Sequence, residues 1–288
     1  MQIDLFGKKR FKVNLHTHTT RSDGRKTPEE VIACYKAAGY DAIALTDHWY
    51  FSKGYDADGI TVLSGAEYNS HTHDCREGVY HIVGVGMRYE PSMTRDASPQ
   101  KIIDAIHAAG GLADLAHPAW SLNTPTQIMA LQNVDYTEIY NTVSGLHMSR
   151  RPDSSLIVDM LAAERRVYPL VADDDAHCYD GDECVSYIMV EAEDNSPASL
   201  LPAIREGRFY ASQGPEIHMW REDNEMVVRS SPVCEVVFHS NLAWAPRVFC
   251  GEALTEVRYK LCEKESFIRA EVIDRDGKHA WSNIITIE

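Results

Sequence analysis

Two histidines one residue apart follow a short apolar run in the stretch FKVNLHTHTTRSDG, residues 11–24. Apolar and polar residues alternate from Phe11 to Leu15, which is typical of a β-strand. Because a strand sends residues i and i+2 to the same side, His16 and His18 are expected to point together. Two imidazoles on one face form either a polar surface pair or half of a metal site.

Similar side chains recur where other predicted strands end. In a parallel α/β barrel the carboxyl ends of the strands gather on one face, where such enzymes place their chemistry. Imidazole and carboxylate groups suit Zn²⁺, Mn²⁺ and Fe²⁺, and the groups are too many for the four to six ligands of one ion. A cluster of two or three ions can activate water for attack on phosphorus. The further strand-end residues are His48, Glu67, His81, His117, Glu138, Asn141, Asp173, Asp174, Asp175 and His177, and Asp23 follows the first strand in a loop.

Predicted strands alternate with predicted helices over the first 212 residues, which indicates a parallel α/β domain. Seven or eight strands favour a closed barrel over an open sheet. From residue 213 the runs become short with period two, which predicts a small all-β module, sandwich-like and appended to the barrel. We therefore expect two domains, 1–212 and 213–288. The helices are expected at 27–40, 98–111, 124–132, 153–166 and 196–208, and the strands at 11–15, 41–48, 60–68, 79–87, 112–118, 136–141, 167–177 and 185–193.

The composition limits the partners that the protein can have. Acidic residues outnumber basic ones, 43 against 28, which gives a formal net charge of −15. This balance argues against an extended nucleic-acid surface or an anionic membrane surface, although bound cations could still attract an anionic substrate. The N-terminus has no apolar signal segment, and no apolar run is long enough to span a bilayer. Seven cysteines without a CxxC motif argue against a disulfide framework, so a cytoplasmic location is expected.

The segments HTHTTRSDG, LTDH, GAE, HIVGVG, AHP and DDDAH, taken together, resemble the PHP family, named for polymerase and histidinol phosphatase. The resemblance covers about residues 11–212. It implies a distorted (β/α)7 TIM-like barrel with a trinuclear metal site on its C-terminal face. The tail, from GRFYASQGPEI onwards, resembles a branch of this family that includes carbaryl-hydrolase-like proteins, whose members are mostly known as predicted metal-dependent phosphoesterases.

The resemblance also implies which residues bind which ion. One ion would be bound by His16, His18, Glu67 and Asp175. Glu67 would bridge to a second ion held by His81 and His117, and Asp23, His48 and His177 would hold the third.

Three positions leave alternatives open. The last motif usually reads Gly-Ser-Asp-x-His or Ser-Asp-Asp-x-His, so Asp173 and Asp174 create a doubt of register. We assign Asp175 as the ligand because it stands two residues before the histidine. His71 and His73 form a second HxH pair that could replace His81, but their polar surroundings favour a solvated loop.

The segment SGLHMSRRP, residues 144–152, could contribute to catalysis or be an ordinary basic loop. His147 is a candidate general acid, and Arg150 and Arg151 could bind an anionic group. Asn141, at the end of its strand, is expected to contact the substrate.

These patterns predict a metal-dependent hydrolase that cleaves the phosphoester of a small phosphorylated metabolite or nucleotide. A hydroxide shared between two of two to three divalent ions would attack phosphorus. The alternative enzyme cleaves a carboxyl or carbamate ester with the same cluster. A non-enzymatic alternative is a binding protein in which the barrel is only a scaffold.

Overall fold

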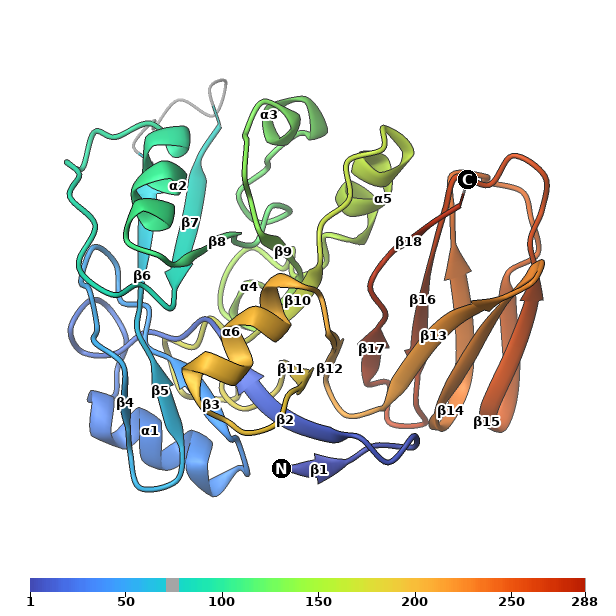
Figure 1. Cartoon of the computed structure of the whole chain (residues 1–288), viewed down its shortest axis with the longest axis horizontal. Coiled ribbons are helices and arrows are strands. Elements are labelled where there is room, and N and C mark those ends of the chain that lie inside the picture. The colour runs from blue at the N-terminus through green and yellow to red at the C-terminus, as the bar shows by residue number, and fades with distance from the viewer. Residues whose placement is uncertain (71–77, 288) are drawn as a thin grey trace.

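The computed structural model describes residues 1–70 and 78–287, and it shows a mixed α/β fold built on two sheets (Figure 1). His71 and His73 lie outside the described residues. The first sheet runs in the order β13 (Ile217–Glu222), β14 (Glu225–His239), β16 (Phe267–Ile273), β17 (His279–Trp281), β12 (Phe209–Ser212), β11 (Tyr187–Glu191), β2 (Lys9–Asn14), β3 (Ala42–Ala44), β5 (Thr61–Leu63) and β4 (Tyr55–Asp56), with β1 (Gln2–Ile3), β15 (Val248–Lys260) and β18 (Ile285–Thr286) paired to β2, β14 and β16. The second runs β10 (Leu170–Asp173), β9 (Tyr136–Asn141), β8 (Leu112–Leu115), β7 (Tyr80–Val85) and β6 (Gly65–Ser70).

The two sheets meet at isolated β-bridges. Within the described residues no ladder of two or more residue pairs joins the sheets, so the expected closed (β/α)7 barrel is not confirmed. One bridge pairs Thr17, just beyond β2, with Ala176, just beyond β10, and another pairs His48 with Glu67. The coarser expectation, a mixed α/β fold, is confirmed.

The pairing direction of several strands differs from the parallel sheet that we expected. β7 is antiparallel to both β6 and β8, and β11 is antiparallel to both β2 and β12. The strand expected at 60–68 is also two strands, because the chain leaves the first sheet after Leu63 and enters the second at Gly65. A buried apolar run shows that a strand is covered on both faces, but it does not specify which neighbour pairs with it or in which direction.

Four of the five expected helices start at a capping residue followed by proline, as the sequence predicts. The fifth, α5, starts after Ser154, whose side chain makes no capping hydrogen bond, and it has no proline in its first turn. At α1, Thr27 and Glu30 form a capping box. The helices are α1 (Pro28–Ala37), α2 (Pro99–Ala108), α3 (Pro125–Met129), α4 (Thr142–Leu146), α5 (Ser155–Ala163) and α6 (Pro197–Arg205). The short helix α4 was not expected and replaces the start of the predicted loop 144–152. Asn141 caps it by accepting a hydrogen bond from the amide of Ser144.

The C-terminal strands β13 to β16 stand side by side at one end of the molecule (Figure 1). They continue the first sheet, because β17 pairs with β12, so the expected separate sandwich is not confirmed. Trp281 of β17 is buried and stacks on Tyr140 of β9, with ring centroids 5.4 Å apart. Arg269 of β16 forms a bidentate ion pair with Asp159 of α5, at 2.6 and 2.7 Å. The boundary between residues 212 and 213 stays a prediction.

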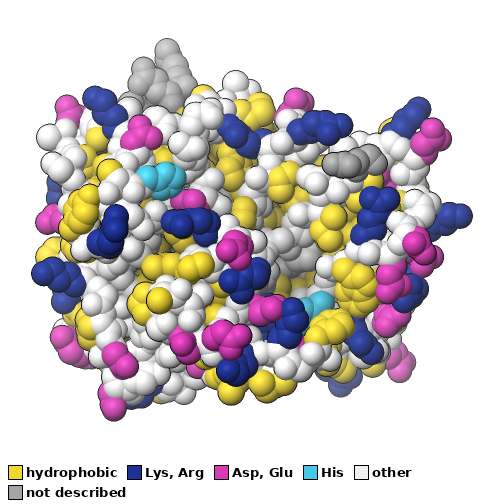
Figure 2. Space-filling view, in the orientation of Figure 1, with side chains coloured by type: hydrophobic (Ala, Val, Ile, Leu, Met, Phe, Trp, Pro, Cys, Tyr) yellow, Lys and Arg dark blue, Asp and Glu magenta, His cyan; other side chains and the backbone are white. Residues whose placement is uncertain are grey.

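The surface seen in one view carries mixed charge, and the described cysteines form no disulfide. Basic and acidic side chains are interspersed over the face seen in Figure 2. The described helices include none long and apolar enough to cross a membrane. The six cysteines within the described residues are all free.

Glu271 of β16 lies between two histidines of the C-terminal region. Its Oε1 is 2.5 Å from Nδ1 of His279, and its Oε2 is 3.4 Å from Nε2 of His239. Burial alone would raise the pKa of this carboxyl. The two histidines and the nearby Arg269 outweigh burial and lower the pKa of Glu271 to about 2.

This shift predicts an acid-sensitive contribution to stability. A carboxylate whose pKa is lowered by folding stabilises the folded state above the unfolded-state pKa, and the contribution is lost as the pH falls through the folded-state pKa. For Glu271 the window runs from 4.5 down to about 2. The shift corresponds to at most roughly 3 kcal/mol.

We therefore expect Glu271→Gln to destabilise the protein near neutral pH and to converge towards wild type as the pH falls through this window. Urea unfolding of the metal-free protein at a series of pH values measures the difference in unfolding free energy. Glu263→Gln, at an exposed position, is the matched control and should follow wild type throughout. A difference that is independent of pH would contradict the assignment.

Candidate metal centre

His16 and His18 follow β2 and both side chains are fully buried. As the strand pattern predicts, they lie side by side, with their Nε2 atoms 3.2 Å apart. The backbone holds this segment in an extended form. The amide of Leu15 donates to Asp173 Oδ1 at 2.7 Å, and the amide of His18 donates to the carbonyl of Ala176 at 3.0 Å.

Glu67 of β6 occupies the centre of the histidine cluster and is 1% exposed. Its Oε2 faces three histidines that belong to the first sheet: Nε2 of His16 at 3.3 Å, Nε2 of His18 at 3.1 Å and Nδ1 of His48 at 3.1 Å. Its Oε1 faces the second sheet, with Nδ1 of His81 at 2.6 Å and Nε2 of His117 at 3.4 Å. One carboxylate thus connects two groups of imidazoles.

Asp175 lies across the cluster from Glu67, in the segment after β10. Its Oδ1 lies 3.1 Å from Nε2 of His16 and 3.0 Å from Nε2 of His18. The two preceding aspartates, Asp173 and Asp174, form other hydrogen bonds. Asp173 accepts a bond from the backbone, while Asp174 accepts from the amides of residues 184–186 and from Asn14 and Tyr35. The structure therefore brings Asp175, and neither of its neighbours, into the cluster.

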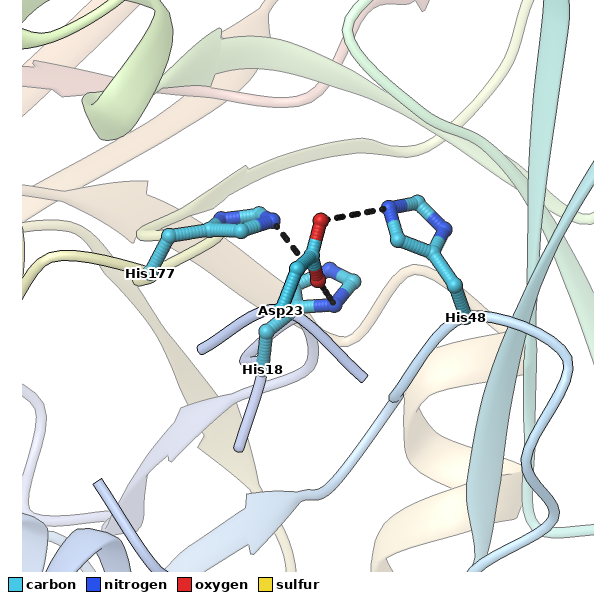
Figure 3. A group of neighbouring side chains, drawn as sticks. All are labelled: His18, Asp23, His48 and His177. Atoms are coloured by element: carbon cyan, nitrogen blue, oxygen red, sulfur yellow. Dashed lines mark ion pairs between the residues drawn. The ribbon is translucent and has the colours of Figure 1, made fainter. Parts of the chain in front are cut away.

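A third group surrounds the carboxylate of Asp23, as Figure 3 shows. Asp23 Oδ1 is 3.5 Å from Nδ1 of His18 and 3.5 Å from Nε2 of His177, and its Oδ2 is 3.7 Å from Nε2 of His48. Asp23 is the most accessible member of the cluster, since its side chain is 55% exposed. It therefore lies where the cluster opens to solvent.

Hydrogen bonds on the far side of several rings fix which nitrogen faces the cluster. Nδ1 of His16 lies 2.6 Å from Glu138 Oε1, and Nδ1 of His177 lies 2.6 Å from the carbonyl of Asp175. Both partners are acceptors, so each Nδ1 carries a proton, and Nε2 is the nitrogen that a cation could bind once its own proton is displaced. His117 can do the same through Ser121, whose hydroxyl is 3.0 Å from its Nδ1. This is the arrangement of histidines that bind metal ions.

Two buried atoms indicate that the cluster fits metal ions. Asp175 Oδ1 and His48 Nδ1 have no hydrogen-bond partner, although acidic or basic atoms lie close to both. A buried polar atom without a partner is costly, and bound cations would satisfy these two atoms. The ligand atoms of His16, His18, Glu67 and Asp175 lie within 4.8 Å of one another, and so do those of His18, Asp23, His48 and His177. Oxygen and imidazole donors of this kind suit borderline divalent ions.

The charges of the buried carboxylates also favour bound cations in the cluster. Burial alone would lower the pKa of His16, but Asp175, Glu67 and Glu138 outweigh it and raise this pKa well above its usual value. In the same way Asp175 and Asp23 raise the pKa of His177 to about 9. His48 is an exception, because burial lowers its pKa to about 4. The carboxylates therefore attract positive charge into the site, which bound cations would supply by displacing protons.

Residues 14–163 match the family described as PHP domain, which is more than half of the chain. The chain belongs to the PHP domain family. The comparison with curated proteins found no match. Membership of the carbaryl-hydrolase-like branch stays a prediction.

One solved structure shares the fold over the whole chain, and two others are similar over part of it. A Bacteroides vulgatus structure, of a two-domain protein containing a predicted PHP-like metal-dependent phosphoesterase, covers 100% of this chain and 97% of its own, with 17% identity and a TM-score of 0.56. An amidohydrolase from Chromobacterium violaceum, with sulfate and no metal, covers 59% and 89% (17% identity, TM-score 0.43). A candidate metal-dependent phosphoesterase from Bifidobacterium adolescentis covers 57% and 87% (14% identity, TM-score 0.41).

The other residues singled out in this PHP domain lie outside the cluster. His147, at the end of α4, is exposed, and its Nε2 lies 3.3 Å from the carbonyl of Asp180. Arg150 and Arg151 are also exposed, and neither lines the pocket above the cluster. Asn141 is fully buried, and its amide donates to Glu138 at 2.7 Å and to Asp175 at 3.2 Å. The geometry thus places Asn141 among the groups that hold the cluster rather than at the pocket surface.

Three buried carboxylates position the cluster, and sequence reasoning gave a role only to Asp174, as an alternative to Asp175 or as its supporting neighbour. Asp47 accepts hydrogen bonds from Thr19 and Ser22 and so fixes the loop that carries Asp23. Glu138 orients His16 and also accepts the backbone amide of His117 at 2.9 Å. Asp174 anchors the segment after the cluster. In the sequence only their position at the ends of predicted strands indicated a role. The expected metal ligands have the same kind of position, so the two groups could not be told apart.

Glu138 provides a test of this outer support. Glu138→Gln keeps the size of the side chain but removes the charge that holds the proton on Nδ1 of His16. Since such partners are worth roughly 10–100-fold in metal affinity, we expect a loss of that size. Competition with a chromophoric chelator measures it. Glu164→Gln, at an exposed position near the end of α5, is the control, and equal affinities in the two variants would contradict the role.

Proposed function

We propose that this PHP domain is a metal-dependent hydrolase that cleaves phosphoesters of small anionic substrates. The observation that carries the proposal is the position of Glu67, a buried carboxylate whose two oxygens face five histidines from both sheets. The alternative interpretation of the HxH motif is a polar pair at the surface, which would be solvated. His16 and His18 are instead fully buried.

The residues proposed to hold two to three divalent ions, Zn, Mn or Fe, form three overlapping groups. His16, His18, Glu67 and Asp175 surround the first position. The second lies between Glu67, His81 and His117. Around the third are Asp23, His48 and His177, with His18 close enough to contribute as well.

Ions bound in such a cluster lower the pKa of water and neutralise charge on a phosphoryl group. The protein contributes the rest. Glu138 keeps the proton on Nδ1 of His16, and Asn141 ties Glu138 to Asp175, so that two ligands keep their relative position when charge develops nearby. Burial of the histidine cluster limits the access of bulk water and strengthens its electrostatic interactions.

Protonation of the leaving group needs an acid near the mouth of the pocket, and His147 is proposed for it. Its neighbour Met148 lines the pocket, so a modest movement of the exposed end of α4 would bring the imidazole to a leaving oxygen. A proton on Nε2, now 3.3 Å from the carbonyl of Asp180, would be the one transferred.

Metal analysis together with hydrolysis assays tests the function. We expect stoichiometric Zn, Mn or Fe in the purified protein and metal-dependent phosphate release from alkyl and aryl monoesters. His16→Ala should lower kcat/KM by more than the roughly 100-fold that an outer partner costs. His107→Ala is the matched control. His107 lies on α2 and pairs with Asp135, away from the cluster, so this variant should keep the wild-type metal content and rate.

Other results would point elsewhere. Cleavage of carboxyl or carbamate esters alone, by a loaded cluster, would contradict phosphoester hydrolysis and favour the alternative enzyme. Failure to bind metal even after reconstitution with Mn²⁺ would contradict the metal centre itself.

A further inference from the structure

The pocket above the candidate metal centre has two chemically different sides. Its volume is about 140 Å³. The floor consists of the histidines and carboxylates of the cluster. The other lining residues, here called the apolar wall, are Trp120, Val143 and Met148, together with Ser144. Trp120 follows β8 in the chain, and the other three belong to α4 and its C-terminal end.

The apolar wall has little capacity for hydrogen bonding. The hydroxyl of Ser144 donates to Oδ1 of Asn141 at 2.6 Å, so it is already engaged. The indole nitrogen of Trp120 has no hydrogen bond to any described residue, and its ring meets the rings of His81 and His117 edge-on, with centroids 5.6 and 5.0 Å away. The ring is thereby held as a fixed surface beside the floor.

One residue of the wall is exposed to solvent. Met148 is 44% exposed although it lines the pocket. A large apolar side chain that remains exposed beside a polar floor is typical of a ligand-binding surface.

The pocket lacks cationic side chains among its described lining residues. Arg150 and Arg151 are exposed and do not line it. A second phosphoryl or carboxylate group on the substrate would therefore find no partner on the wall, and burying it there would be unfavourable. Only the floor can neutralise negative charge.

We propose, on the basis of the proposed function, that the substrate is an ester with a single phosphoryl group and a compact, uncharged apolar group. The phosphoryl group lies on the floor, and the apolar group packs against Trp120 and Met148. A cavity of about 150 Å³ is large enough for benzene. The phosphoryl group shares this pocket of about 140 Å³, so the apolar group must be compact, at most about one ring. Sugar phosphates and nucleoside di- or triphosphates are disfavoured, because their hydroxyls or extra charges would face the apolar wall.

Benzyl phosphate and glycerol 3-phosphate test the proposal with the metal-loaded full chain. Both are monoesters of primary alcohols, so they differ mainly in the polarity of the group that meets the wall. We expect kcat/KM to favour benzyl phosphate by roughly 10-fold or more, the usual effect of apolar pocket contacts. Met148→Gln, which keeps length but not apolarity, should lower this ratio by roughly 3- to 10-fold.

Met160→Gln is the matched control. Met160 lies on α5, is 48% exposed and does not line the pocket, so its variant should keep the wild-type ratio. A binding measurement avoids dependence on turnover: calorimetric titration should show tighter binding of benzylphosphonate than of methylphosphonate, with the preference reduced in Met148→Gln.

The outcomes separate the two proposals. Equal kcat/KM for the two esters, or a ratio unchanged in Met148→Gln, would overturn the apolar specificity while leaving phosphoester hydrolysis intact. Absence of hydrolysis for both esters, together with absence of phosphonate binding, would overturn the proposed function on which this inference rests.

Discussion

The structure depends on how two open sheets are joined where they meet. Glu67 lies at one junction and Asp175 at the other. The amide of Glu67 donates to the carbonyl of Thr46, and the amide of Asp175 donates to the carbonyl of His16. At both places one sheet presents a carboxylate, from within β6 for Glu67 and from just after β10 for Asp175, and the other sheet presents histidines that follow its strands. The backbone contacts that link the sheets and the side-chain contacts that form the candidate centre are therefore the same local structures.

This coupling explains why so many buried acids surround the site. Burying three carboxylates would be prohibitive unless each is satisfied by hydrogen bonds or opposite charge. Asp47, Glu138 and Asp174 accept backbone amides and side-chain donors, so they are largely satisfied by the protein itself. Asp175 is the contrasting case, since one of its oxygens is buried without a hydrogen bond. An unsatisfied oxygen alone does not identify a ligand, because Asp114 and Asp173 have such oxygens as well. Asp175 combines it with imidazole nitrogens 3.0 and 3.1 Å away.

The sequence predicted the members of the cluster better than it predicted the sheets. Spacing rules place His16 and His18 on one side of a strand, and residues at the ends of buried strands converge whatever the exact pairing. The direction of β7 and the division of the segment 60–68 could not be predicted, because both depend on which neighbour each strand meets. The short helix α4 was missed for a related reason: five residues that include Gly145 carry too weak a local preference.

The apolar wall also arises from this unpredicted part of the fold. Asn141 ends β9, donates to Glu138 and to Asp175, and accepts hydrogen bonds from the amide and the hydroxyl of Ser144. That cap starts α4 directly above the floor and turns Val143 and Met148 towards the pocket. A single amide thus sets the position of the metal-binding side and of the apolar side relative to each other. Asn141 is saturated by these hydrogen bonds, so it contributes to specificity by positioning the apolar wall. Its place at a strand end had instead predicted direct contact with the substrate.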